Sequence, residues 1–170
     1  EHNQLMLSMY DKLRDNVLAS ANPFNTAMRL AIAGNVIDFG SHHRLDVLET
    51  IDRVLTAKLA IDHSEKLQKE LKEAGSVLYI GDNAGEIVLD KIFLSILNHP
   101  NITFAVRGTP VLNDAVEKDA RDVGIDTYAN LITTGDDAPG VIPETSSAGF
   151  SRVFNEADVV ISKGQGNFEG

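Results

Sequence analysis

The most informative part of this chain reads Val77-Leu78-Tyr79-Ile80-Gly81-Asp82-Asn83-Ala84-Gly85-Glu86. Four apolar residues are typical of a buried strand, and the glycine after them indicates a tight turn into a helix. Such turns at the carboxyl ends of parallel strands are where open α/β sheets place their ligands, beside backbone N–H groups and the positive end of a helix dipole. This turn presents a carboxylate and an amide, which suit a hard cation. We therefore interpret Asp82 and Asn83 as half of a metal site.

A structural role for the same residues is the alternative. Asn83 followed three residues later by Glu86 is typical of an N-cap with a capping box, at the start of a helix predicted over residues 84–97. An amide can serve a helix and still offer its oxygen to a metal, so both interpretations stay open.

The second half of the chain alternates strands with helices. Short runs rich in β-branched residues predict strands at 77–80, 102–106, 131–134 and 159–162. Helical patterns occupy the segments between them, at 84–97, 111–123 and about 146–156. This alternation predicts βαβ units with right-handed crossovers. We therefore expect an α/β fold, a Rossmann-like parallel sheet with flanking helices, over residues 76–170.

The first 75 residues are helical in pattern. Apolar residues recur every four positions from Leu5 to Val17, and Pro23 separates this run from a second predicted helix at 26–33. Two more helices are predicted, over 45–59 and from residue 64. We expect residues 1–75 to form an N-terminal helical lobe that precedes the α/β domain.

A polar interruption follows the second helix at Gly34-Asn35-Val36-Ile37-Asp38-Phe39-Gly40. Two glycines around an amide and a carboxylate are typical of a turn whose side chains bond their own backbone. The alternative is a functional loop, and we predict that Asn35 and Asp38 reach the candidate metal site from the helical lobe.

The predicted strands all end in polar or glycine-rich loops, which meet at one edge of a parallel sheet. Asp114 falls in the first turn of the helix predicted at 111–123, where an acid is also favoured by the helix dipole. As a third oxygen ligand beside Asp82 and Asn83, it would complete a cation site with open positions for water and substrate.

Two cationic residues at strand ends are candidate contacts to an anion. Arg107 ends the second strand and Lys163 ends the fourth. Lys163 is the better candidate because Gly164 and Gly166 let backbone N–H groups approach an anion closely.

Composition narrows the function classes. The 170 residues are 43% hydrophobic and 24% charged, which is ordinary for a globular domain. A formal net charge of −10 disfavours binding to nucleic acid, which needs Lys and Arg to neutralise phosphates. The absence of Cys excludes thiolate catalysis and Cys-ligated zinc. No apolar run approaches the roughly 20 residues that span a bilayer, so we expect a cytoplasmic protein with no membrane partner. The chain lacks an initiator Met, and we expect it to be a piece of a longer fold.

Four segments of the chain form a specific set in this order: Gly34-Asn35-Val36-Ile37-Asp38, then Gly81-Asp82-Asn83-Ala84-Gly85-Glu86, then Arg107-Gly108-Thr109-Pro110 with Asn113-Asp114-Ala115, and finally Asp158-Val159-Val160-Ile161-Ser162-Lys163-Gly164-Gln165-Gly166-Asn167-Phe168-Glu169. The set resembles the metal-dependent damage-control phosphatases, also known as domain of unknown function 89. It is most similar to the archaeal and microbial branch of that family, and the resemblance runs from about residue 34 to the last residue.

The resemblance implies one divalent cation, Mn, Co, Ni or Mg, held by Asp82, Asn83 and Asp114. It also implies that the substrate phosphate is bound by the lysine and glycine loop, through Lys163, Gly164, Gln165, Gly166 and Asn167. A further lysine on a later strand is implied as well, and this chain ends before that position.

The sequence and the resemblance together predict an enzyme. We expect a metal-dependent phosphatase that hydrolyses small phosphate monoesters, such as sugar phosphates or damaged phosphometabolites, by a metal-activated water. The predicted catalytic residues are Asp82, Asn83, Asp114 and Lys163. The predicted substrate contacts are Asn35, Asp38, Glu86, Arg107, Gly108, Gly164, Gln165, Gly166 and Asn167.

Two alternatives to a phosphatase stay open. The strand and glycine turn at 77–85 loosely echo the binding turn of an S-adenosylmethionine-dependent carboxyl methyltransferase, although Asn83 stands where a second glycine would let the cofactor approach. A non-catalytic metal-dependent binding domain is the other alternative.

Overall fold

The structure, a computed structural model, describes residues 2–37, 44–136, 138 and 140–170. The elements in chain order are α1 (His2–Leu7), α2 (Tyr10–Ala19), α3 (Pro23–Val36), α4 (Arg44–Thr56), α5 (Ser64–Glu73), β1 (Val77–Ile80), α6 (Glu86–Leu97), β2 (Ile102–Val106), α7 (Glu117–Val123), the 3-10 turn η1 (Ile125–Thr127), β3 (Asn130–Thr133), α8 (Ala148–Glu156), β4 (Val159–Ser162) and α9 (Gln165–Glu169). None of the helices in these described ranges has the length and apolar character to cross a membrane.

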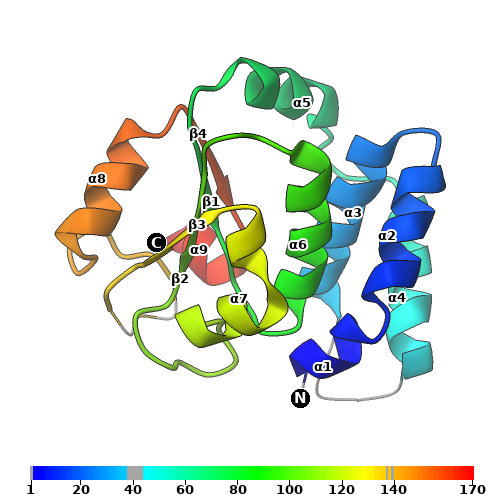
Figure 1. Ribbon diagram of the computed structural model, residues 1–170, viewed down its shortest axis with the longest axis horizontal. Helices are drawn as coiled ribbons and strands as arrows, with labels where there is room; N and C mark the ends of the chain where they lie inside the picture. Colours follow the sequence, from blue (N-terminus) through cyan, green and yellow to red (C-terminus); the bar gives the residue numbers. More distant parts are fainter. Residues whose placement is uncertain (1, 38–43, 137, 139) are drawn as a thin grey trace.

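The strands form where the sequence places its apolar runs. Within the described residues, four strands make one parallel sheet in the order β3-β2-β1-β4 (Figure 1). The chain moves from β1 outward to β3 and then returns to the other side of β1, so β1 and β4 flank a topological switch point. The predicted α/β fold with a parallel sheet and flanking helices is confirmed.

Alternate strand residues face two different layers. Tyr79 and Phe104 stack with ring centroids 5.2 Å apart on the face covered by α3 and α6. Leu78 and Ile80 face the other way and pack with Phe150 of α8. Figure 1 shows α8 on the side of the sheet opposite to α3 and α6. Because both faces are covered, β1 is buried along its whole length, as expected of a central parallel strand.

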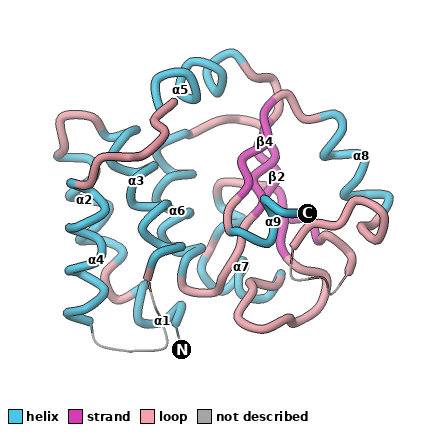
Figure 2. Tube along the Cα trace, turned by 180° about the vertical axis from the view of Figure 1, so that it is seen from behind, coloured by secondary structure: helices cyan, strands magenta, loops and turns pink. Residues whose placement is uncertain are grey.

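The N-terminal helices and the sheet share one apolar core. Met6 and Leu30 belong to the same buried cluster as Phe93 and Phe104. Phe24 of α3 meets Phe93 of α6 edge to face, with ring centroids 5.5 Å apart. Figure 2 shows α2, α3 and α4 grouped beside α6. The described N-terminal helices are therefore packed continuously onto the sheet and its helices through α3 and α6.

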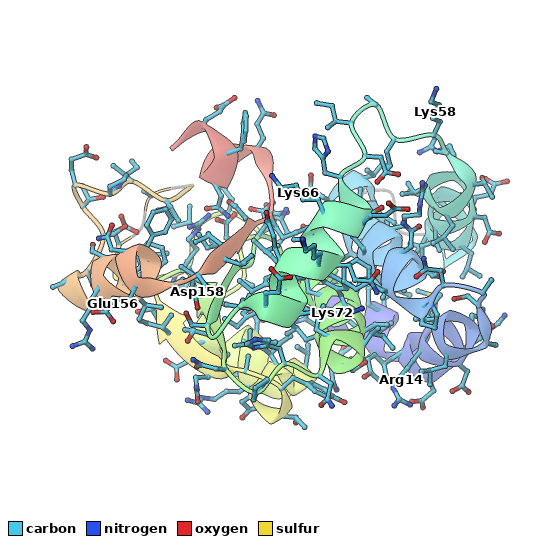
Figure 3. The ribbon with its side chains drawn as sticks, turned by 90° about the horizontal axis from the view of Figure 1, so that it is seen from above. Arg14, Lys58, Lys66, Lys72, Glu156 and Asp158 are labelled. Atoms are coloured by element: carbon cyan, nitrogen blue, oxygen red, sulfur yellow. The ribbon has the colours of Figure 1, made fainter. Side chains whose placement is uncertain are left out.

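The amino ends of β1 and β4 are tied together by one carboxylate. Asp158 Oδ2 accepts hydrogen bonds from the backbone N–H groups of Gly75 and Ser76, both at 2.9 Å. Figure 3 shows Asp158 and Glu156 where α8 passes into β4. This tie fixes the relative position of the two strands whose opposite ends carry Asp82 and Lys163.

The structure corrects the expected interruption at Gly34 and Asn35. Both residues are helical, because α3 continues to Val36. Gly34 allows α3 to approach α6 closely, since a Cβ atom there would lie 2.8 Å from the Cγ atom of Glu86. Asp38 lies outside the described residues. The glycine therefore serves helix packing at this position and does not start a turn.

Replacing Gly34 by alanine is expected to destabilise the protein by about 1–3 kcal/mol, because the added methyl group overpacks the contact with Glu86. Inside an unobstructed helix the same change would stabilise by about 0.5–1 kcal/mol. Urea unfolding of the variant and the wild type measures the difference. Gly149→Ala in α8 is the matched control, because its added Cβ meets only Ser147 Oγ at 3.9 Å. A Gly34→Ala protein as stable as the wild type would contradict the close packing.

The start of α6 also differs from the prediction. The helix begins at Glu86, and its N-cap is Gly85 with φ 87° and no capping side chain. Asn83 lies before the helix, and its amide donates to carboxylates. The predicted capping box of Asn83 and Glu86 is therefore wrong, and both side chains are left for interactions outside the helix.

Candidate metal centre

The candidate site lies where the loops after β1, β2 and β4 meet. Asn167 joins these loops: its Nδ2 donates to the carbonyl oxygens of Gly81 (3.2 Å) and Lys163 (2.7 Å). Its Oδ1 accepts a hydrogen bond from the Arg107 guanidinium at 2.7 Å. Asn167 is buried and bridges three strand ends in this structure, while its predicted contact with a substrate stays a prediction.

Asp82, Asn83 and Asp114 are brought side by side by a short backbone pairing. Asn83 forms an isolated antiparallel bridge with Asp114. The Ala115 N–H donates to the Asp82 carbonyl at 2.7 Å, and the Ala84 N–H donates to the Asn113 carbonyl at 2.8 Å. The loops after β1 and β2 are thus fixed to each other next to the three predicted metal ligands.

The sequence predicts Asp114 in the first turn of a helix, but Asp114 is not helical, and this pairing explains why. Helix α7 begins only at Glu117, and Val116 pairs with Arg107 in a second isolated bridge. Leu112, with φ 48°, turns the chain between Val111 and Asp114. Tertiary pairing therefore overrides a local helical pattern over residues 111–116.

Asp82 is the centre of a hydrogen-bonded group of side chains. Its Oδ2 accepts hydrogen bonds from Nδ2 of Asn83 (2.8 Å) and of Asn35 (3.0 Å). Burial, and then the charges of Glu86 and Asp114, raise the pKa of Asp82 to about 6, against the opposing effect of nearby cations. The last turn of α3 therefore delivers Asn35 to this site, as predicted.

Lys163 lies beneath this group, in a buried ionic cluster. Its ammonium donates to Glu86 Oε1 (2.5 Å), to Asp90 Oδ1 (3.0 Å) and to the carbonyl oxygen of Ala31 (2.8 Å). The Tyr79 hydroxyl also donates to Asp90 Oδ1, at 2.6 Å. Burial opposes the charge of the ammonium, but Asp90 and Glu86 outweigh it and raise the pKa of Lys163. Lys163 is thus charged and directed toward acceptors of this chain, and its predicted contact with a substrate phosphate stays a prediction.

Arg107 is also committed to a protein partner. Its Nε donates to Asp114 Oδ2 at 2.6 Å, and only 2% of the arginine is exposed. The guanidinium thereby orients Asp114 and compensates its charge. The predicted contact between Arg107 and substrate stays a prediction, and in this structure the arginine supports the Asp114 carboxylate.

The donor set suits a divalent cation by its charge and its chemistry. Among the described residues of this cluster, the carboxylates of Asp82, Glu86, Asp90 and Asp114 face the cations Lys163 and Arg107, which leaves an excess of two negative charges. Carboxylate and amide oxygens are the ligands that hard cations select. Within the described ranges no three Asp, Glu or His side chains group as a metal site, so the predicted set depends on the Asn83 amide as well as on Asp82 and Asp114. That set fits a cation that keeps several water ligands.

The remaining predicted contacts are placed as follows. Gly108 lets the loop after β2 approach the loop after β3, since a Cβ atom there would lie 2.8 Å from the Gly135 carbonyl carbon. Gln165 and Gly166 belong to α9, so the expected loop is already helical there. The Gln165 side chain is exposed and donates to Glu169 at 2.6 Å.

Two buried participants were missed from the sequence. Asp90 and Tyr79 lie in segments that read as plain apolar core. One signal was present for Asp90, which follows Glu86 by one helical turn on a mostly apolar helix and therefore shares its face. Tyr79 gave no signal that separates it from a core aromatic residue.

A Gly164→Ala variant is expected to weaken cation binding by about 10- to 100-fold. Gly164 has φ 85°, and a Cβ atom there would lie 2.2 Å from Asp82 Oδ2, so the added methyl group displaces the predicted ligand. Titration of the protein with Mn²⁺ by calorimetry measures the effect.

Gly124→Ala is the matched control for this variant. Gly124 has a similar φ of 78°, but its Cβ atom would meet the flexible end of Lys91, at 3.2 Å. It should lose comparable stability and keep its Mn²⁺ affinity. Equal weakening of Mn²⁺ binding in both variants would show that backbone strain, and not Asp82, is responsible.

The chain is similar to known proteins along most of its length. Residues 1–170 match the family described as the damage-control phosphatase ARMT1-like domain. The damage-control phosphatase PH1575 of Pyrococcus horikoshii is 39% identical over 150 residues, which cover 86% of this chain and 52% of that protein. An uncharacterized protein of Methanocaldococcus jannaschii, MJ0202, is 38% identical over 174 residues, which cover 98% of this chain and 57% of that protein.

A solved structure matches over the same extent. The crystal structure of a DUF89 family protein from Pyrococcus horikoshii has a TM-score of 0.89 and 35% identity, covering 99% of this chain and 59% of that chain. The present chain thus spans about half the length of the curated relatives it matches. By the family match along its whole length and by these relatives, the chain belongs to the damage-control phosphatase family with the ARMT1-like domain, also called DUF89.

Proposed function

We propose that this domain forms a metal-dependent phosphatase site for small phosphate monoesters, such as sugar phosphates or damaged phosphometabolites. The observation that carries the proposal is the meeting of Asp82, Asn83 and Asp114 at the carboxyl ends of β1 and β2, within a cluster that has two negative charges in excess. The family and the name of the Pyrococcus relative support the phosphatase reaction.

The chain's own residues have distinct tasks in this proposal. Asp82, Asn83 and Asp114 hold a divalent cation, which would supply Lewis-acid polarisation of a phosphoryl oxygen and a more acidic water. Arg107 orients the carboxylate of Asp114 through the contact of 2.6 Å. Gly164 leaves room for Asp82, because any side chain there would collide with its carboxylate. The excess of two negative charges would balance the charge of a bound divalent cation.

The two alternatives make different predictions. A methyltransferase would bind S-adenosylmethionine without a metal, and a binding domain would bind the metal without turnover. The family match supports neither a carboxyl methyltransferase nor a loss of catalysis.

The test compares these outcomes in one preparation. We expect the chain, stripped of metal with a chelator, to hydrolyse p-nitrophenyl phosphate only after addition of Mn²⁺, Co²⁺, Ni²⁺ or Mg²⁺. S-adenosylmethionine should not bind in a calorimetric titration. Binding of Mn²⁺ with no hydrolysis of any phosphate ester would favour the binding domain, and binding of S-adenosylmethionine would favour the methyltransferase.

A further inference from the structure

Lys163 has no N–H donor left for a substrate anion. An ammonium group has three N–H donors. All three are used by acceptors of this chain, namely Glu86, Asp90 and the carbonyl oxygen of Ala31. Only 9% of Lys163 is exposed. A direct contact with phosphate would require the ammonium to abandon two buried carboxylates, which is costly for buried charges.

Glu86 connects Lys163 to the residues around Asp82. Its Oε1 accepts from Lys163, while its Oε2 accepts longer hydrogen bonds, both 3.4 Å, from Nδ2 of Asn35 and of Asn83. The same two amide nitrogens donate to Asp82 Oδ2. Each amide group is therefore held on its nitrogen side by two carboxylates.

This arrangement fixes the direction of both amide groups. An ionised carboxylate only accepts hydrogen bonds, so the NH₂ side of each amide must face Asp82 and Glu86. The amide is planar with its oxygen on the other arm, so Oδ1 of Asn35 and Oδ1 of Asn83 are turned away from Asp82 Oδ2 and Glu86 Oε2, while Asp82 Oδ1 accepts from no described residue. No described residue donates to either amide oxygen. Amide oxygens are ligands for hard cations, and the nitrogens of these two amides share the same two acceptors.

We propose that Lys163 is a positioning residue of the cation site, which holds Glu86 so that Glu86 turns the amide oxygens of Asn83 and Asn35 toward the cation. Asn35 is then a further oxygen donor beside Asp82, Asn83 and Asp114. The inference rests on the proposed function, because it concerns the same cation. In this proposal Lys163 supports the metal ligands through Glu86 and does not bind the substrate phosphate.

The test measures Mn²⁺ affinity in two variants by calorimetry, without any turnover. Lys163→Met removes the ammonium. Glu86→Gln keeps the shape of the side chain but introduces an NH₂ group that competes with the amide nitrogens of Asn35 and Asn83. We expect each variant to bind Mn²⁺ about 10- to 100-fold more weakly, as found when partners that orient metal ligands are lost.

Arg29→Met is the matched control for Lys163→Met. Arg29 is also a long cation that donates to backbone carbonyls, those of Val54 and Ala57, and faces a carboxylate, Asp62. It lies outside the cation site, so Mn²⁺ affinity should stay at the wild-type value. Circular dichroism and thermal unfolding identify any variant that does not fold, and if Lys163→Met fails to fold, the isosteric Glu86→Gln variant decides.

A second measurement separates metal binding from phosphate binding. At saturating Mn²⁺, the affinity for inorganic phosphate should be the same in Lys163→Met and wild type. If Lys163→Met binds Mn²⁺ with wild-type affinity but binds phosphate more weakly, the positioning role is overturned and Lys163 is a substrate contact. Unchanged Mn²⁺ affinity in Glu86→Gln would overturn it as well. If the wild-type chain binds no Mn²⁺, the proposed metal-dependent function itself fails, and the positioning role fails with it.

Discussion

Asp82→Asn is expected to abolish metal-dependent phosphatase activity while the fold stays intact. The change keeps the size of the side chain and removes the central charge, which the two asparagine amides and the Asp114 loop surround. In the proposed function that carboxylate is a cation ligand, so kcat/KM should fall by about 10³-fold or to the background rate. Steady-state hydrolysis of p-nitrophenyl phosphate in excess Mn²⁺ measures the loss.

Although Asp82→Asn should lose activity, its folded state should be as stable as that of the wild type or more stable. Burial and the charges of Glu86 and Asp114 raise the pKa of Asp82 to about 6, so its ionised form is disfavoured in the folded state. In the presence of a chelator, Asp82→Asn should therefore unfold at the same temperature as the wild type or at a higher one. The gain in stability is present above pH about 6. It disappears toward pH about 4, where the wild-type carboxyl is protonated in the unfolded state as well as in the folded state. If the Asp82→Asn variant hydrolyses substrate at the wild-type rate, Asp82 is not part of the catalytic site.

Lys163→Met is expected to destabilise the protein by about 3–5 kcal/mol, the cost of leaving buried charges without their partner. Glu86 and Asp90 are both fully buried, and both accept from this ammonium. Asp90 Oδ2 already lacks a hydrogen-bond partner among the described residues, so the loss of Lys163 leaves Tyr79 as the remaining donor to Asp90. Urea unfolding of the metal-free protein, followed by circular dichroism, measures the change.

The Arg29→Met control should cost less. Its partner Asp62 has a side chain that is 42% exposed, so water compensates the charge that is left behind. The remaining loss comes from hydrogen bonds to the Asn25 side chain and to the carbonyls of Val54 and Ala57. If Lys163→Met and Arg29→Met lose the same small amount, below about 1 kcal/mol, the buried cluster behaves as a hydrated surface pair. That result would contradict its description as a buried ionic cluster.

The fold and the meeting of the three predicted ligands could be predicted because both follow from local patterns. The run from Val77 to Ile80 and the glycine after it determine a strand and its end without reference to the rest of the chain. Once strands and helices alternate, the carboxyl ends of the strands must share an edge. Asp82, Asn83 and Asp114 therefore lie close together although two of them precede residue 84 and the third follows residue 113.

The errors concern residues whose role depends on distant partners. Gly34 reads as a turn residue in sequence, but its small size is required by Glu86 on another helix. Asn83 and Glu86 have the spacing of a capping box, but a positive φ at Gly85 starts the helix later. The phosphate contact predicted for Lys163 stays a prediction, but its loop gave no sign that Asp90 and Glu86 accept from its ammonium. The contacts of Gly34 and Lys163 with Glu86 and Asp90 join residues far apart in the sequence, so no local pattern predicts them.

One measurement tests the central claim most directly. Crystals grown with Mn²⁺ and measured at a wavelength where manganese scatters anomalously locate the ion without assumptions about its ligands. We predict one peak within about 2.0–2.6 Å of carboxylate oxygens of Asp82 and Asp114 and of the amide oxygen of Asn83. A saturated crystal with no peak at these oxygens, or with its manganese bound elsewhere, would contradict the account.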